Sequence, residues 1–152
     1  MRWWAVTTGR VIVLALTCGL GLSSCVSPAH NSAGYRNKVG HAAEKMSGII
    51  GSAQLAAEQN LDGKAFDTFA DQVISQAEQD AQSVLGQLDS VQPPDDQSVQ
   101  LRNQADDVLQ SAASDLSDLR IAQRRGDESG MRQSLSDLKD DLAKVQKLQD
   151  NA

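Results

Sequence analysis

The segment 126–150, GDESGMRQSLSDLKDDLAKVQKLQD, decides the fold of this chain. Its large apolar residues recur at alternating steps of four and three, at Met131, Leu135, Leu138, Leu142 and Val145. This spacing places them on one face of an α-helix, as in a heptad repeat. Gly126 suits the left-handed residue that ends a preceding helix, and Asp127 is a favoured N-cap residue. The segment therefore predicts a helix over about 128–149 that follows a tight turn and buries one face.

Three upstream segments carry similar apolar stripes, and each predicts a further helix, over about 38–60, 64–92 and 94–124. The first stripe consists of Val39, Ala43, Met46, Ile50, Ala53 and Ala57. The second consists of Phe66, Ala70, Val73, Ala77, Ala81, Val84, Leu88 and Val91. The third consists of Leu101, Ala105, Val108, Leu109, Ala112, Leu116 and Leu119. Such stripes indicate amphipathic helices that pack against one another.

Turn signals separate the predicted helices. Residues 60–63, NLDG, form a turn sequence in which Asp62 is expected to cap the second helix. The Pro93-Pro94 pair ends that helix, because proline lacks an N–H and restricts the residue before it. The aspartates at 95 and 96 then place negative charge where it complements the dipole of the third helix.

Four amphipathic helices joined by short turns predict an all-α fold, an up-down-up-down four-helix bundle over 39–150. Extended helical hairpins are the alternative, because the stripes are narrow and rich in alanine. Aromatic residues are scarce: after position 25 only Tyr35, Phe66 and Phe69 remain. In the up-down order, the turns near Asp62 and Gly126 lie at one end of the bundle, and the Pro93-Pro94 turn lies at the other.

Two glycines, Gly48 and Gly51, interrupt the first predicted helix, each at a cost of about 1 kcal/mol relative to alanine. The favoured interpretation is the close approach of a neighbouring helix. The other is a hinge beside a ligand groove.

The N-terminal segment has the composition of a secretory signal. Residues 1–10 carry Arg2 and Arg10 and no acid, and residues 11–22 carry no charge. That run is too short to span a bilayer, which takes roughly 20 apolar residues. It ends in Leu22-Ser23-Ser24-Cys25. This sequence resembles the lipobox of bacterial lipoproteins, which has a branched apolar residue, two small residues and then a cysteine.

The resemblance covers the first 25 residues and implies a processed, acylated protein. It implies cleavage of the signal peptide, 1–24, between Ser24 and Cys25, and a diacylglycerol, with acyl chains such as palmitate, on Cys25. Residues 25–38 would then be the lipidated cysteine and a flexible tether. The expected location is the extracytoplasmic face of the cell membrane, or the outer membrane in a cell with two membranes, where Val26 after the cysteine fits outer-membrane sorting.

The composition of the remaining chain argues against several functional classes. Cleavage removes two arginines and no acid, so the formal net charge moves from −6 to −8, which argues against a nucleic-acid partner. No cysteine follows Cys25, and no Glu-x-x-His pair, catalytic triad or calcium-loop spacing is present. We therefore expect no enzyme, no cofactor and no metal site. The adjacent acid pairs 95–96, 106–107 and 140–141 are expected to lie on solvated helix faces.

Four arginines near the third turn are the candidate contact residues for a partner or an anion: Arg120, Arg124, Arg125 and Arg132. They could bind a carboxylate or phosphate of an envelope polymer or of a partner protein. Complementation of the helix dipole and solubility explain them equally well.

The expected function is that of a lipid-anchored interaction or scaffold module at the cell envelope, which binds the membrane through Cys25 and an envelope protein through its exposed helix faces. The alternative is a ligand-binding lipoprotein that holds an apolar or anionic small molecule between its helices, with Gly48, Gly51 and the alanines as the groove. The aromatic lining usual for such pockets is missing.

Overall fold

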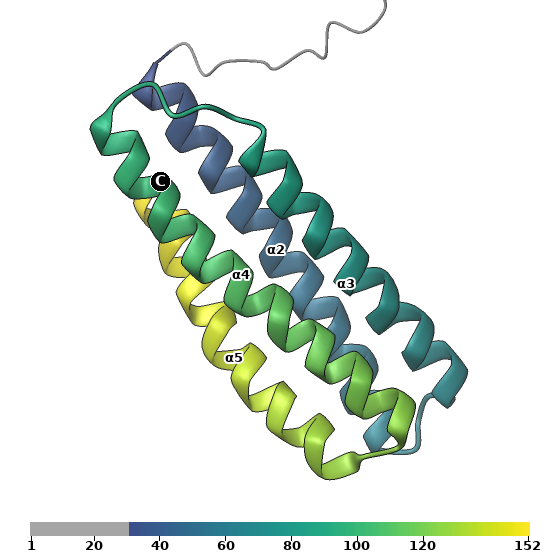
Figure 1. The fold of residues 1–152 in the computed structure, drawn as a ribbon. Coiled ribbons are helices and arrows are strands. Elements are labelled where there is room, and N and C mark those ends of the chain that lie inside the picture. Colours follow the sequence, from purple (N-terminus) through teal and green to yellow (C-terminus); the bar gives the residue numbers. More distant parts are fainter. Residues whose placement is uncertain (1–30) are drawn as a thin grey trace, which may run out of the picture.

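Four α-helices in chain order, running alternately up and down, make up the part of the chain that the computed structural model describes, residues 31–152. They are α2 (Ser32–Leu61), α3 (Asp67–Asp89), α4 (Asp96–Arg125) and α5 (Glu128–Asn151). This arrangement confirms the up-down-up-down four-helix bundle (Figure 1). The signal peptide, Cys25 and residues 26–30 of the expected tether lie outside the described residues.

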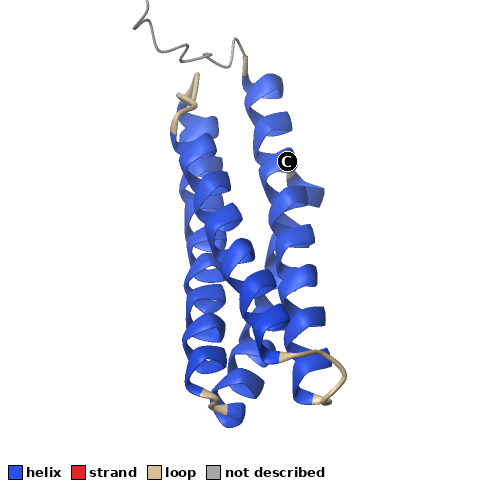
Figure 2. Ribbon diagram, turned by 90° about the vertical axis from the view of Figure 1, so that its right-hand side faces the viewer, coloured by secondary structure: helices blue, strands red, loops and turns tan. Residues whose placement is uncertain are grey.

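The bundle has two distinct ends (Figures 1 and 2). The near end holds Ser32, where α2 begins, together with the α3–α4 turn. The far end holds the α2–α3 turn and the α4–α5 turn. The predicted placement of the three turns is therefore confirmed. Within residues 31–152, no helix is both long and apolar enough to cross a membrane.

The cross-section is rhombic, because one diagonal pair of helices touches and the other does not. α2 and α4 contact each other across the core, whereas α3 and α5 do not meet within the described chain. Small buried side chains on the touching pair allow this approach, because the distance between helix axes depends on the side chains at the contact. They are Ala43, Ala53 and Ala57 on α2, with Ala105, Ala112 and Ala113 on α4. Because α2 also packs on α5, the alternative of extended hairpins is wrong.

α2 begins at Ser32, so the expectation that residues 32–38 belong to the tether is wrong. The side chain of Asn31 accepts a hydrogen bond from the Gly34 N–H at 2.7 Å and caps the helix. Tyr35, one turn into the helix, is completely buried. The cap and this buried ring hold a polar stretch in the helix although its own apolar pattern is weak.

The α2–α3 turn differs from the expectation at two residues. Asp62 follows the last residue of α2, and its N–H donates to the carbonyl of Glu58 at 3.0 Å, so it does not cap the next helix. Gly63 adopts the left-handed backbone conformation that the turn requires, with φ of 69°. α3 then starts at Asp67, and Phe66 stands at the N-cap without a side-chain hydrogen bond. Phe66 therefore leaves the apolar stripe, and Ile74 is a core residue that the predicted stripe omitted.

The two later helices each begin with an aspartate cap: Asp95 at α4, which was expected in the first turn of that helix, and the predicted cap Asp127 at α5. The side chain of Asp95 accepts a hydrogen bond from the Ser98 N–H at 2.8 Å at the start of α4. Gly126 has φ of 63° after α4, and Asp127 accepts a hydrogen bond from the Gly130 N–H at 3.0 Å at the start of α5. The tight turn predicted at Gly126 and Asp127 is confirmed.

Gly48 and Gly51 do not serve close helix packing. A Cβ atom built at either position would meet no atom outside its own helix turn within 4 Å. Both glycines lie on the exposed side of α2. The favoured interpretation, close approach of a neighbouring helix, is therefore wrong. The two glycines destabilise α2 relative to alanine, and helix packing does not compensate for this loss.

Candidate functional site at the far end of the bundle

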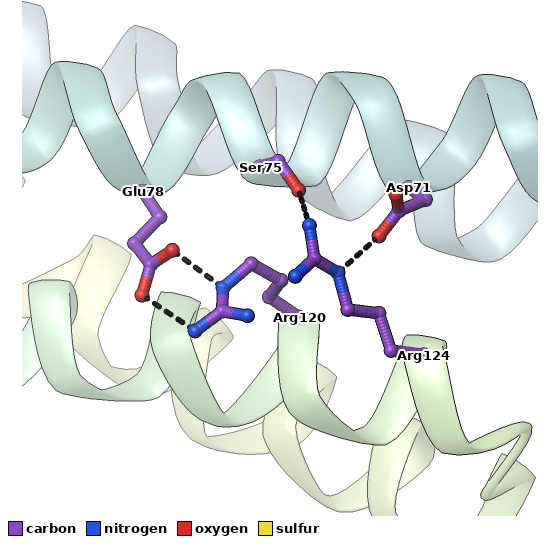
Figure 3. A network of polar contacts seen from close by, with 5 residues as sticks. All are labelled: Asp71, Ser75, Glu78, Arg120 and Arg124. Carbon is purple, nitrogen blue, oxygen red and sulfur yellow. Dashed lines mark hydrogen bonds and ion pairs between the residues drawn. The ribbon is translucent and has the colours of Figure 1, made fainter.

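Arg120 on α4 forms a two-pronged ion pair with Glu78 on α3 (Figure 3). Its Nε lies 2.5 Å from Oε2 of Glu78, and its Nη2 lies 3.3 Å from Oε1. Burial by itself would raise the pKa of Glu78, but hydrogen bonds from Arg120 and Ser117 outweigh it and hold the pKa below its usual value. This arginine therefore binds α3 to α4.

Arg124, one turn further along α4, also points toward α3 (Figure 3). Its Nε donates to Oδ1 of Asp71 at 2.8 Å, and its Nη2 donates to Oγ of Ser75 at 3.2 Å. Both partners come from α3. The structure thus brings Arg120 and Arg124 together, but it engages them inside the molecule.

The other two candidate arginines are more exposed. Arg132 pairs with Glu128 on its own helix, at 3.6 Å between Nη2 and Oε2. Arg125 ends α4, and no carboxylate of residues 31–152 lies within 4.0 Å of its guanidinium. Of the four arginines proposed as a partner or anion contact, Arg125 is therefore the one that the described bundle leaves most available.

An open cleft of about 640 Å³ lies beside Arg125 at the far end. The ends of α2 and α4 and the beginnings of α3 and α5 form its walls. The Asn60 side chain braces one wall, because it donates to Oδ1 of Asp67 at 2.8 Å and to the Ala65 carbonyl at 3.2 Å. Charges of both signs line the cleft, including Arg124 and Glu128. Such a surface suits polar contacts at the edge of an interface.

Two aromatic side chains at the far end are exposed to solvent. Phe66 is 85% exposed and Phe69 is 58% exposed, and they flank the start of α3. They are the only phenylalanines in the chain. We call Phe66 and Phe69 the aromatic pair. The apolar period predicted Phe66 in the core and gave no role to Phe69. No residue with a capping side chain stands at the N-cap of α3, because Phe66 itself occupies that position.

The aromatic pair is the feature of the far end that folding does not explain. A phenylalanine gains about 1.5–3 kcal/mol when it is fully buried, and the core of this protein uses aliphatic residues and Tyr35 instead. Aromatic residues are enriched in the buried centres of protein interfaces. The far end therefore combines two exposed aromatic rings with a cleft lined by charges of both signs.

A search for metal-binding side chains and comparisons with known proteins give no further assignment for this end of the bundle. Among residues 31–152, no group of three or more His, Cys, Asp and Glu side chains is arranged to hold a metal ion. Comparisons with protein-family models, with curated proteins and with solved structures found no match. The geometry of the bundle is therefore the basis for its functional interpretation.

Proposed function

We propose that this protein is a lipid-anchored, extracytoplasmic docking module that holds a binding surface away from the membrane at the cell envelope. The observation that carries the proposal is the position of the aromatic pair. Phe66 and Phe69 are exposed at the far end, opposite to Ser32, where the chain enters the bundle (Figure 1). A partner protein with an apolar pocket would bury both rings.

The anchor and the bundle together give this surface a defined reach. Only residues 26–31 separate Cys25 from α2, and this stretch spans at most roughly 25 Å when fully extended. An acylated Cys25 would therefore hold the near end close to the bilayer. α4 has 30 residues, which corresponds to a length of about 45 Å. The far end would then stand several tens of ångströms from the lipid.

Anchoring would also favour the encounter with a membrane partner. Confinement to a surface raises the effective concentration of one protein near another without any new contact. The proposed partner is an envelope protein and not a nucleic acid, because the chain is acidic, with a formal net charge of −6 before cleavage. The proposal includes no catalytic activity.

The alternative, a lipoprotein that holds a small molecule between its helices, has less support from the packing. The alanines that were expected to line its groove lie in the core between α2 and α4. Gly48 lines a shallow groove between α2 and α3, whereas Gly51 opens directly to solvent.

Cross-linking in intact cells tests the docking proposal. The tagged protein is purified from the membrane, and its adducts are identified by mass spectrometry. We expect one dominant adduct, which disappears in the double variant Phe66→Ser/Phe69→Ser. The matched control is Val99→Ser, which changes an exposed apolar residue at the near end. An adduct that survives in the double variant, or that is equally lost in the control, contradicts docking through the aromatic pair.

A further inference from the structure

Asp141 on α5 is a buried carboxylate with one unsatisfied oxygen. Its side chain is 1% exposed, so the expectation that residues 140–141 lie on a solvated face is wrong for this residue. Its Oδ1 accepts a hydrogen bond from Oγ of Ser111 at 3.2 Å and one from Nζ of Lys144 at 2.6 Å. Its Oδ2 is buried and has no hydrogen-bond donor among the described residues. A buried carboxylate oxygen without a hydrogen-bond donor destabilises the folded state, so a donor at this atom would be stabilising.

Asp115 on α4 has a side chain that interacts with that of Asp141. It lies one turn after Ser111 and so faces the same strip of α5. Its carboxyl group is half-buried and lies close enough to the carboxyl group of Asp141 for a hydrogen bond to form when one of the two is protonated. Two ionised carboxylates only accept hydrogen bonds, so a contact between them forms a hydrogen bond when one of them is protonated.

The surroundings of Asp115 favour retention of that proton. The strongest charges acting on it belong to Asp141 and Asp137 on α5 and to Asp118 on α4, and none of these belongs to α2 or α3. Lys144 offsets part of this negative charge through its contact with Asp141. Burial, then the hydrogen bond with Asp141, then these charges raise the pKa of Asp115 to about 6.

We propose that Asp115 holds a proton that it donates to the buried carboxylate of Asp141 between α4 and α5, and that loss of this proton toward neutral pH loosens the contact between these helices. In the protonated state, the Asp115 hydroxyl donates to Oδ2 of Asp141. When the proton leaves to solvent, two negative carboxylates remain in contact and repel each other. This proton site is independent of the lipid anchor and of the docking surface.

The sign of the pH effect follows from proton linkage. Asp115 has a higher pKa in the folded protein than in the unfolded chain, where it is about 3.8. Between these two values the folded state binds more protons, so stability falls as pH rises from about 4 to about 6. Glu78 and Asp127 have lowered pKa values, so each contributes stability to the fold at higher pH. That contribution is lost as pH falls through the pKa of the group in the folded protein.

A carboxyl titration by ¹³C NMR tests the proton site without any substitution. The full chain is labelled and solubilised in mild detergent. We expect the Asp115 carboxyl resonance to titrate with a midpoint near 6. A midpoint below 5 overturns the proposal.

Thermal unfolding of Asp115→Asn provides the second test. The amide N–H₂ can donate to Oδ2 of Asp141 at every pH. We expect the Tm of the unsubstituted protein to fall by roughly 3–6 °C between pH 5 and 7.5. Asp115→Asn should remove most of that fall and raise the Tm at pH 7.5. Asp107→Asn, which makes the same change at an exposed site on α4, should keep the fall. An unchanged fall in Asp115→Asn overturns the proposal.

Discussion

Arg120 and Glu78 face each other across the α3–α4 contact. Two hydrogen bonds join these residues, which are 42 positions apart in the sequence. Each side chain is about one-fifth exposed. The pair is therefore intermediate between an exposed ion pair, which contributes little to folding stability, and a buried ion pair, whose disruption is strongly destabilising. Its position makes it a structural contact of the bundle, although Arg120 had been a candidate for partner binding.

Arg120→Ala should lower the free energy of unfolding by about 1–2 kcal/mol, because Glu78 would keep its partly buried charge without its main partner. Urea denaturation of Arg120→Ala, Glu78→Ala and the double variant gives their coupling energy. We expect the double variant to be less destabilised than the sum of the two single changes. Arg132→Ala is the control, since its contact with Glu128 is long and exposed, and it should leave stability unchanged. Additive losses would show that the pair does not hold the helices together.

Gly48→Ala and Gly51→Ala should each stabilise the protein by about 0.5–1 kcal/mol. Both positions are inside α2, and a Cβ meets nothing nearby, so alanine gains helix propensity without a clash. Gly126→Ala makes the same change at φ of 63° and should destabilise. Urea midpoints measure all three variants. A destabilising Gly48→Ala would mean that the α2–α3 groove has no room for a methyl group.

The helix pattern was predictable from the sequence where burial follows local periodicity. In α5 the predicted seam residues Met131, Leu138 and Val145 are buried. Leu135 and Leu142 of the same seam are only half-buried, and the polar residues Ser134 and Asp141 take the buried positions beside them. The start of α2 was not predictable in this way, because Tyr35 is buried by helices that are distant in sequence. Phe66 fits the apolar period when it is counted back from Ala70. However, α3 begins only at Asp67, so Phe66 lies outside the helix and does not join its buried face.

The polar contacts were less predictable than the helices. Arg124 near the end of α4 was equally consistent with dipole complementation, a partner or an ion pair. The register of α3 against α4 decides that it meets Asp71, and register depends on packing along the whole bundle. Asp141 looked like one of two adjacent surface acids, yet its helix face is the one turned toward α4, where Ser111 reaches it. Residue type and spacing do not contain this information.

Phe66→Ser and Phe69→Ser should leave the free energy of unfolding within about 0.5 kcal/mol of its original value, because both rings are exposed. Serine at position 66 can also accept a hydrogen bond at the uncapped start of α3, which favours the fold. Ile74→Ala, at a fully buried site on the same helix, should cost about 2–5 kcal/mol. Thermal or urea unfolding separates the two cases. A large loss in either phenylalanine variant would assign the rings to folding and not to docking.

Cys25→Ser should move the protein from the membrane fraction to the soluble fraction. Each acyl methylene buried in a bilayer contributes about 0.8 kcal/mol, and two or more chains are needed for stable attachment. Serine removes the thiol that would carry them, and no helix within residues 31–152 could replace them as a membrane span. Cys18→Ser is the matched control, because Cys18 lies inside the apolar run that would be discarded. Detergent phase partitioning followed by immunoblotting gives the readout. If Cys25→Ser stays in the detergent phase like the control, Cys25 is not the anchor, and the far end has no fixed distance from the lipid.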